Sequence, residues 1–164
     1  MWTIDFIVGL VSVTIGTVAF SILFGVRPKH LPMVGIGAAG TMIIYSLIEY
    51  FGFSLFSAAF ISTVAAAVFS EFCARVRRAP AIVFLVPSLL PTIPGGSLYR
   101  AMSAFLAKDH QAGLDHLMLT LKVSIGIAGG IVTVSLVVKV VMSIIEGIKA
   151  KRMNDDDGDI ADEV

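Results

Sequence analysis

Charge and cysteine are both scarce in this sequence, and each shortage excludes a class of protein. Charged residues account for 15% of the 164 residues, and 12 basic and 12 acidic side chains give a formal net charge of zero. Soluble domains carry about 25% charged residues, so a soluble enzyme domain is excluded. A nucleic-acid partner is excluded as well, because no basic face exists. The single cysteine, Cys73, can form neither an internal disulfide nor a thiolate zinc site.

Long apolar runs take the place of the missing charge. Hydrophobic residues make up 57% of the chain, and its mean hydropathy is +0.92. A helix needs about 20 apolar residues to cross a bilayer, and backbone groups in lipid must be paired, so such runs predict helices. The runs cover residues 4–26, 31–51, 53–72, 81–107 and 117–138. We therefore expect an all-α integral membrane protein in the lipid bilayer, with a five-span membrane domain over residues 1–148.

Basic residues in the loops predict the orientation of the spans, because cytoplasmic loops carry an excess of Lys and Arg. If the N-terminus lies outside, Lys108 is the one basic loop residue that lies outside. The basic residues on the cytoplasmic side are then Arg27, Lys29, Arg75, Arg77, Arg78, Lys149, Lys151 and Arg152. A re-entrant loop at residues 81–107 would place the last basic cluster outside, against this rule. Residues 149–164 end in a run of acidic residues, and we expect a disordered, charged cytoplasmic tail there.

The fourth apolar run concentrates proline and glycine. The prolines are Pro87, Pro91 and Pro94, and Gly95 and Gly96 follow them directly. Proline lacks an N–H and clashes with the carbonyl four residues back, so we expect the carbonyls of Val83, Pro87 and Leu90 to be released. Counted from Ala81 at about 1.5 Å per residue, the break begins near the middle of the bilayer. The sequence therefore predicts that the fourth span is a broken helix.

A broken span offers a place for a substrate. The half-helix that begins near Ser97 would present free N–H groups and the positive end of its dipole, and transporters aim such an end at an anionic substrate group. The alternative is a kinked helix that only packs. The residues expected to bind the substrate are Pro87, Pro91, Pro94, Gly95, Gly96, Ser97 and Tyr99. Among the ionisable residues of the spans, Glu49 is the candidate for proton coupling.

The broken span also carries a family resemblance. Residues 78–87 (RAPAIVFLVP) and 91–99 (PTIPGGSLY) resemble the signature of the threonine/serine exporter family, and the chain is most similar to its small five-span subunit or C-terminal half. This resemblance implies a multi-pass, secondary-active exporter of small amino acids in the bacterial inner membrane, or in some branches of C4-dicarboxylates such as succinate. It also implies a separate, larger multi-span exporter subunit as the partner.

The remaining motifs favour helix packing over chemistry. Residues 35–40 fit the GxGxxG pattern, but they lie inside a span with no strand before them, so close helix approach is the better reading. Gly126 with Gly130 and Ser12 with Gly16 have the same small-residue spacing. No nucleophile–base set is present, so we expect no enzyme activity, no cofactor and no metal site. A non-transporting membrane scaffold or assembly protein stays as an alternative function.

Overall fold

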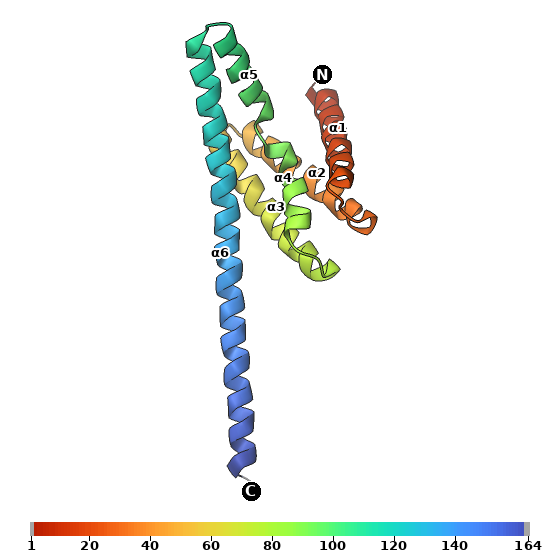
Figure 1. The fold of residues 1–164 in the computed structure, drawn as a ribbon, viewed down its shortest axis with the longest axis vertical. Coiled ribbons are helices and arrows are strands. Elements are labelled where there is room, and N and C mark those ends of the chain that lie inside the picture. The colour runs from red at the N-terminus through yellow and green to blue at the C-terminus, as the bar shows by residue number, and fades with distance from the viewer. Residues whose placement is uncertain (1, 163–164) are drawn as a thin grey trace. The chain divides into compact units, whose positions relative to one another are not determined.

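The computed structural model describes residues 2–162, and its regular elements are helices (Figure 1). In order, they are α1 (Trp2–Leu23), the 3₁₀ turn η1 (Pro28–His30), α2 (Leu31–Tyr50), α3 (Leu55–Arg77), α4 (Ile82–Leu89), the 3₁₀ turn η2 (Leu90–Thr92), α5 (Gly95–Leu106) and α6 (His110–Asp162). The helices agree with the predicted apolar runs to within a few residues at most ends. The largest differences are at α3, which runs on to Arg77, and at α6, which is far longer than predicted.

Four connections between helices each contain one residue with a positive φ. The residues and angles are Gly25 at 73°, Gly52 at 80°, Arg78 at 49° and Lys108 at 63°. Glycine adopts this conformation without steric cost, whereas Arg78 does so as the C-cap of α3, where its N–H donates to the carbonyl of Ala74. At the other end of α3, the Ser54 hydroxyl accepts from the N–H of Ser57 at 3.2 Å. These caps fix both ends of α3 and hence the start of α4.

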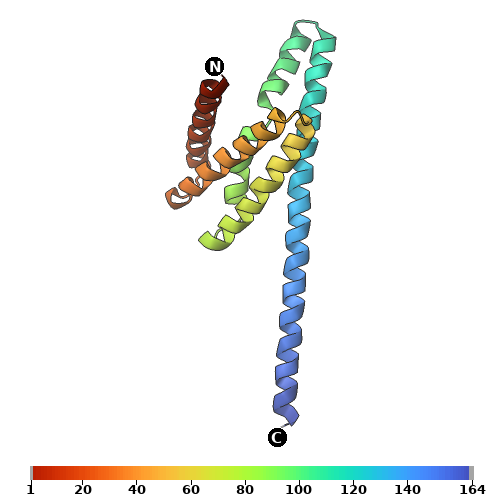
Figure 2. The same ribbon diagram turned by 180° about the vertical axis from the view of Figure 1, so that it is seen from behind.

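The residues up to 131 form one compact unit in which α2 contacts α1, α3 and α4 (Figure 2). Its interior is built mainly from small side chains, and alanines at positions 38, 58, 59, 66 and 67 are buried. Larger buried side chains gather at one end, where Val34, Cys73 and Phe84 pack together. Large apolar side chains are exposed along every α-helix of this unit. Small residues inside and large apolar residues outside are typical of helices packed in lipid.

Four helices are long and apolar enough to cross a membrane: Phe6–Leu23, Pro28–Tyr50, Leu55–Arg77 and His110–Ile145. A fifth candidate is the pair Ile82–Thr92 and Gly95–Leu106, whose two parts are bent by 49° at a short break. By length and composition, the described residues therefore contain four candidate membrane-spanning helices, or five if the bent pair is one span.

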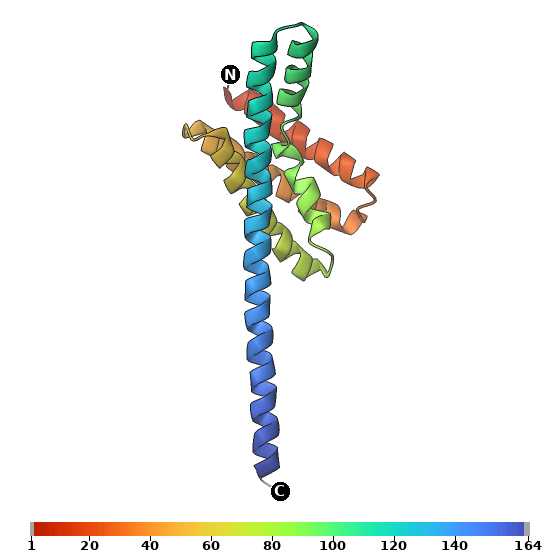
Figure 3. The same ribbon diagram turned by 60° about the vertical axis from the view of Figure 1, so that its left-hand side comes forward.

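The first part of α6 runs in the same direction as α3 and crosses it obliquely (Figure 3). A Cβ atom built at Gly126 lies 2.9 Å from the carbonyl oxygen of Phe56, and one built at Gly130 lies 3.0 Å from the carbonyl oxygen of Phe60. The contacts therefore advance along both helices in the same direction. At both positions glycine lets the backbones approach more closely than any larger residue allows, as the GxxxG spacing predicts.

Residues from 132 onward form a second unit, which consists of the continuation of α6. Residues 149–162 are helical, whereas the sequence predicts a disordered tail over 149–164. Extending an existing helix adds one hydrogen bond per residue without a new nucleation cost, which accounts for helix in a polar segment. Glu163 and Val164 lie outside the described residues.

Candidate functional site

The break between α4 and α5 is a short extended segment. After η2, Ile93 has φ −63° and ψ 123°, which is extended backbone, and Pro94 has φ −79° and ψ 50°. The helix resumes at Gly95, and the two halves are bent by 49°. Pro87 lies inside α4, Pro91 lies in the first turn of η2 and Pro94 is the N-cap of α5. Each proline therefore has a separate place in the break.

The backbone in front of the break is paired, which corrects part of the sequence-based expectation. The Pro87 carbonyl accepts from the N–H of Leu90, and the Leu90 carbonyl accepts from the N–H of Ile93 at 3.3 Å. The expectation that these two carbonyls are released is wrong. Prolines at 91 and 94 remove the N–H donors that an α-helix would use, but the preceding residues, Leu90 and Ile93, still carry an N–H. The chain tightens into a 3₁₀ turn, in which these two N–H groups pair with the carbonyls instead.

The backbone behind the break is open. Gly95 donates to the Ile93 carbonyl at 2.8 Å, and Leu98 donates to the Pro94 carbonyl at 3.1 Å. The N–H groups of Gly96 and Ser97 have no acceptor among the described residues, and no side chain caps the helix. A Cβ atom at Gly95 or Gly96 would meet nothing within 4 Å. The N–H groups of Gly96 and Ser97 are thus available at the positive end of α5, whereas that of Gly95 is used in a turn.

The residues predicted to bind substrate follow one another along this segment with graded exposure. Pro87 is buried. Three of the others are half-buried, namely Pro91, Pro94 and Ser97. The remaining three are exposed, namely Gly95, Gly96 and Tyr99. Tyr99 is 74% exposed. Glu49, the predicted proton-coupling residue, is exposed in the last turn of α2. The open part of the site therefore faces away from this chain.

Buried hydroxyls on α4 and η2 are the feature that the sequence analysis missed. Ser88 is fully buried and Thr92 is 4% exposed, and neither side-chain oxygen has a hydrogen-bond partner among the described residues. Thr63 on α3 is a third buried hydroxyl in this state, and it lies away from the break. Most buried hydroxyls elsewhere donate to their own helix, as Ser70 does to the Ala66 carbonyl and Thr41 to the Gly37 carbonyl. An unpaired buried hydroxyl costs about 1–3 kcal/mol. In the sequence, the one signal that separates Ser88 and Thr92 from the paired hydroxyls is their position among the prolines.

Ser88 occupies the space that the missing side chain of Gly37 leaves on α2. A Cβ atom built at Gly37 would collide with Oγ of Ser88 and lie 3.0 Å from Cε1 of Phe69. On another face of α2, a Cβ at Gly35 would lie 3.4 Å from Val18 on α1. Gly35 and Gly37 of the GxGxxG pattern thus mark close helix contacts, whereas a Cβ at Gly40 would meet nothing within 4 Å. At Gly37, α4 lies against bare backbone of α2.

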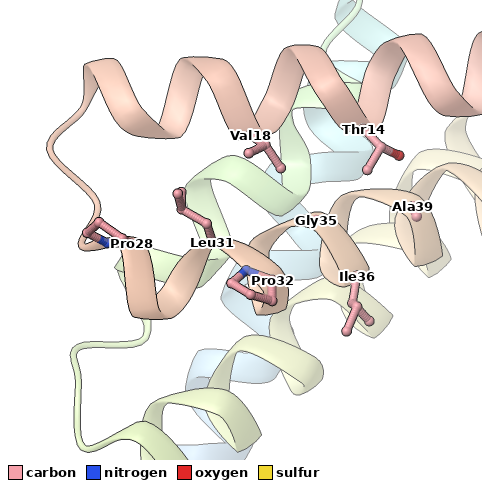
Figure 4. Close-up of a pocket in the computed structure, with 8 residues that line it drawn as sticks. All are labelled: Thr14, Val18, Pro28, Leu31, Pro32, Gly35, Ile36 and Ala39. Atoms are coloured by element: carbon pink, nitrogen blue, oxygen red, sulfur yellow. The ribbon is translucent and has the colours of Figure 1, made fainter.

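An apolar groove lies elsewhere, between α1 and α2 (Figure 4). Its volume is about 580 Å³, and its lining is Thr14, Val18, Pro28, Leu31, Pro32, Gly35, Ile36 and Ala39. Its one hydroxyl, that of Thr14, already donates to the Leu10 carbonyl at 2.7 Å. An almost wholly apolar groove has nothing to orient an amino acid, so the polar site is the break.

The family comparison covers this break. Residues 9–137 match the family described as Threonine/Serine exporter, ThrE. The chain belongs to the threonine/serine exporter family. This confirms the resemblance drawn from residues 78–99. Neither a curated protein nor a solved structure matches the chain.

Membership in the threonine/serine exporter family makes the chain an exporter-type membrane protein. The matched region begins in α1, includes α4, η2 and α5 entirely, and ends within α6 before the predicted tail. The open half-helix end and the unpaired hydroxyls of Ser88 and Thr92 thus belong to the exporter domain itself. The family is one of transporters, and transporters are generally not enzymes.

Proposed function

We propose that this chain is a subunit of a secondary-active exporter that moves small amino acids such as threonine and serine out across the bacterial inner membrane. The observation that carries the proposal is the open N-terminus of α5, where Gly96 and Ser97 present unpaired N–H groups inside the exporter domain. Such an end suits the carboxylate of an amino acid, since the N–H groups and the helix dipole both favour an anion. Tyr99, one turn further on, supplies a hydroxyl near the same end.

Five crossings, with the fourth span broken, account best for the helix directions. Since α3 and the start of α6 run parallel, the chain between them must return from the end of α3 to the level where α3 began. The pair α4–η2 and α5 is the segment that connects those two levels. A re-entrant loop would leave α3 and α6 antiparallel.

The packing also supports an orientation with the N-terminus outside and the C-terminus in the cytoplasm. Contacts among Val34, Cys73 and Phe84 bring the loop after α1, the last turns of α3 and the start of α4 to one end of the unit. That end carries the basic residues Arg27, Lys29, Arg75, Arg77 and Arg78. Excess Lys and Arg on one side marks the cytoplasmic face.

A larger multi-span exporter subunit is the proposed partner. Gly95 and Gly96 are exposed, and the N–H groups of Gly96 and Ser97 are unpaired within this chain. Unpaired backbone at membrane depth is tolerated against protein or a water-filled cavity but not against lipid. A second subunit that covers this face would enclose the substrate site between the two chains.

The test uses cells of the source organism in which the chromosomal gene for this chain is deleted and a variant is expressed instead. The cells are loaded with labelled threonine or, in parallel, labelled succinate, and efflux of the label is measured. We expect Gly96→Val to lose most threonine efflux at normal membrane insertion, because the new side chain blocks access to the N–H groups. Gly147→Val is the matched control, since a Cβ at either glycine meets nothing within 4 Å. Full efflux by Gly96→Val, or efflux of succinate alone by the unmodified chain, would contradict the proposal.

A further inference from the structure

The two buried hydroxyls that precede the break have no structural use in this chain. Ser88 and Thr92 are four residues apart, and their oxygens are fully enclosed and unpaired. Ser88 lies in the last turn of α4, and Thr92 ends the 3₁₀ turn η2. Both elements contact α2. Two unpaired hydroxyls therefore lie on the segment that packs against α2 and leads into the break.

Neighbouring helices show what a purely structural hydroxyl does. Ser21 donates to the Thr17 carbonyl at 2.7 Å, and Ser70 donates to the Ala66 carbonyl at 2.7 Å. A hydroxyl that bonds its own helix needs no further partner in lipid. Ser88 and Thr92 keep their donors and acceptors unused, which in a buried site calls for a ligand or for water.

The position of the pair suggests what the ligand is. Thr92 is the last residue of η2, and the unpaired N–H groups of Gly96 and Ser97 follow directly after the break. Only three residues separate Thr92 from Gly96 along the chain, so an amino acid whose carboxylate lies at the Gly96 and Ser97 N–H groups can extend toward the Thr92 hydroxyl. Hydroxyl oxygens accept from an ammonium group and both accept from and donate to a hydroxyl.

We propose that Ser88 and Thr92 bind the hydroxyl and ammonium groups of the exported amino acid, with α4 moving away from α2 to admit them. This assignment rests on the proposed function. Movement is required because both oxygens are enclosed, and Gly37 makes it possible, since Ser88 faces bare backbone rather than an interlocked side chain. The pair then gives the exporter its preference for amino acids that carry a hydroxyl.

The experiment compares efflux of labelled L-threonine with that of L-2-aminobutyrate, which has the same carbon skeleton but lacks the hydroxyl. A site built to bond a hydroxyl rejects the analogue without it. We expect the unmodified chain to prefer threonine, and we expect Ser88→Ala and Thr92→Val to lower that preference about tenfold each, the effect of one hydrogen bond. Thr92→Ser, which keeps the hydroxyl, should retain the preference for threonine.

Ser70→Ala is the matched control, because it removes a buried hydroxyl that is already paired with the Ala66 carbonyl. It should leave the threonine to aminobutyrate ratio unchanged. Replacing an unpaired buried hydroxyl with an apolar group is close to neutral for folding, so the Ser88 and Thr92 variants should insert normally.

Three results would overturn the assignment. They are an unmodified chain that exports both compounds equally, variants that keep the ratio of the unmodified chain, and variants that lose both activities in proportion, as a structural role predicts. If the unmodified chain exports neither compound, the proposed function itself fails. The two failures are therefore distinguishable.

Discussion

Gly37 is the residue on which the close packing of α4 against α2 depends. A Cβ atom at this position would lie 3.0 Å from Cε1 of Phe69 and 3.2 Å from Cβ of Ser88, besides colliding with Oγ of Ser88. We expect Gly37→Ala to destabilise the protein by about 1–3 kcal/mol, the range for overpacking a tight interior. Thermal unfolding of the purified protein in detergent measures the effect as a lower melting temperature.

Gly40→Ala is the control for this prediction, because a Cβ at Gly40 meets nothing within 4 Å. In a helix interior alanine is favoured over glycine by about 0.5–1 kcal/mol, so this variant should melt at the same temperature or higher. Adding Ser88→Ala to Gly37→Ala should restore part of the loss, since the colliding oxygen is removed. Equal melting temperatures for Gly37→Ala and Gly40→Ala would show that the contact is not tight.

The sequence showed which residues are small but not what they touch. The GxGxxG spacing correctly predicted close helix approach, yet only the fold shows that Gly37 meets Ser88 and that Gly35 meets Val18. The unpaired state of Ser88 could not be predicted either. Ser70 and Ser88 both lie in apolar helices, and the difference in their hydrogen bonding emerges only when the packed backbone is known.

At the scale of helices, the spacing of the prolines breaks the span but leaves N–H donors that pair with two carbonyls before the break. Prolines at 91 and 94 leave donors at Leu90 and Ile93, which pair with carbonyls three residues back. The carbonyls of Pro87 and Leu90 are thus paired, and the unpaired N–H groups lie at the N-terminus of α5. A helix N-terminus with free donors favours an anion.

Removing the prolines tests whether the break is a site or a kink. Pro91→Ala with Pro94→Ala restores two N–H donors, so we expect a continuous helix from α4 into α5. The variant should melt at a higher temperature, because the two added N–H groups can pair in a continuous helix that replaces the 3₁₀ turn and the extended segment. It should nevertheless lose threonine efflux, because the N–H groups of Gly96 and Ser97 would then be paired.

Pro32→Ala is the control for this element, since Pro32 lies in the first turn of α2, where a missing N–H is harmless. That variant should keep its efflux. Efflux and melting temperature are measured on the same preparations, normalised to inserted protein. Normal efflux by the double proline variant would mean that the break serves packing alone.

Sequence patterns predicted the helices better than their ends. The apolar runs located every helix from α1 to α5, because run length in lipid decides which segments are helical. The basic residues Arg75 and Arg77, expected in a loop, instead form the last turn of α3, where cations favour the negative end of the helix dipole. The proline carbonyls were misjudged because the alternative 3₁₀ pairing depends on the local bend.

At the scale of the whole molecule, two observations support the proposed topology. The basic residues of the loops after α1 and α3 gather at one end of the compact unit, and the glycine contacts show that α3 and the start of α6 run in the same direction. The first comes from charge and the second from packing. The shared direction of α3 and α6 is the observation that supports a crossing between Arg78 and Lys108.

Labelling on the two sides of this segment gives a direct test. In a Cys73→Ala background, which removes the buried native thiol, Arg78→Cys and Lys108→Cys place one thiol in each loop that flanks α4 and α5. A membrane-impermeant thiol reagent added to intact cells should label Lys108→Cys, and it should label Arg78→Cys only after permeabilisation. Both native side chains are exposed, so access depends on the side of the membrane and not on burial.

Two further positions calibrate the two sides without involving the bent pair. Lys29→Cys lies in the loop after α1 and should behave as Arg78→Cys does, whereas Tyr50→Cys lies at the end of α2 and should behave as Lys108→Cys does. If α4 and α5 formed a re-entrant loop, Arg78→Cys and Lys108→Cys would be labelled from the same side. The N-terminus of α5 would then open toward one face only, and α6 would have to cross in the opposite direction to α3, against the parallel contacts of Gly126 and Gly130.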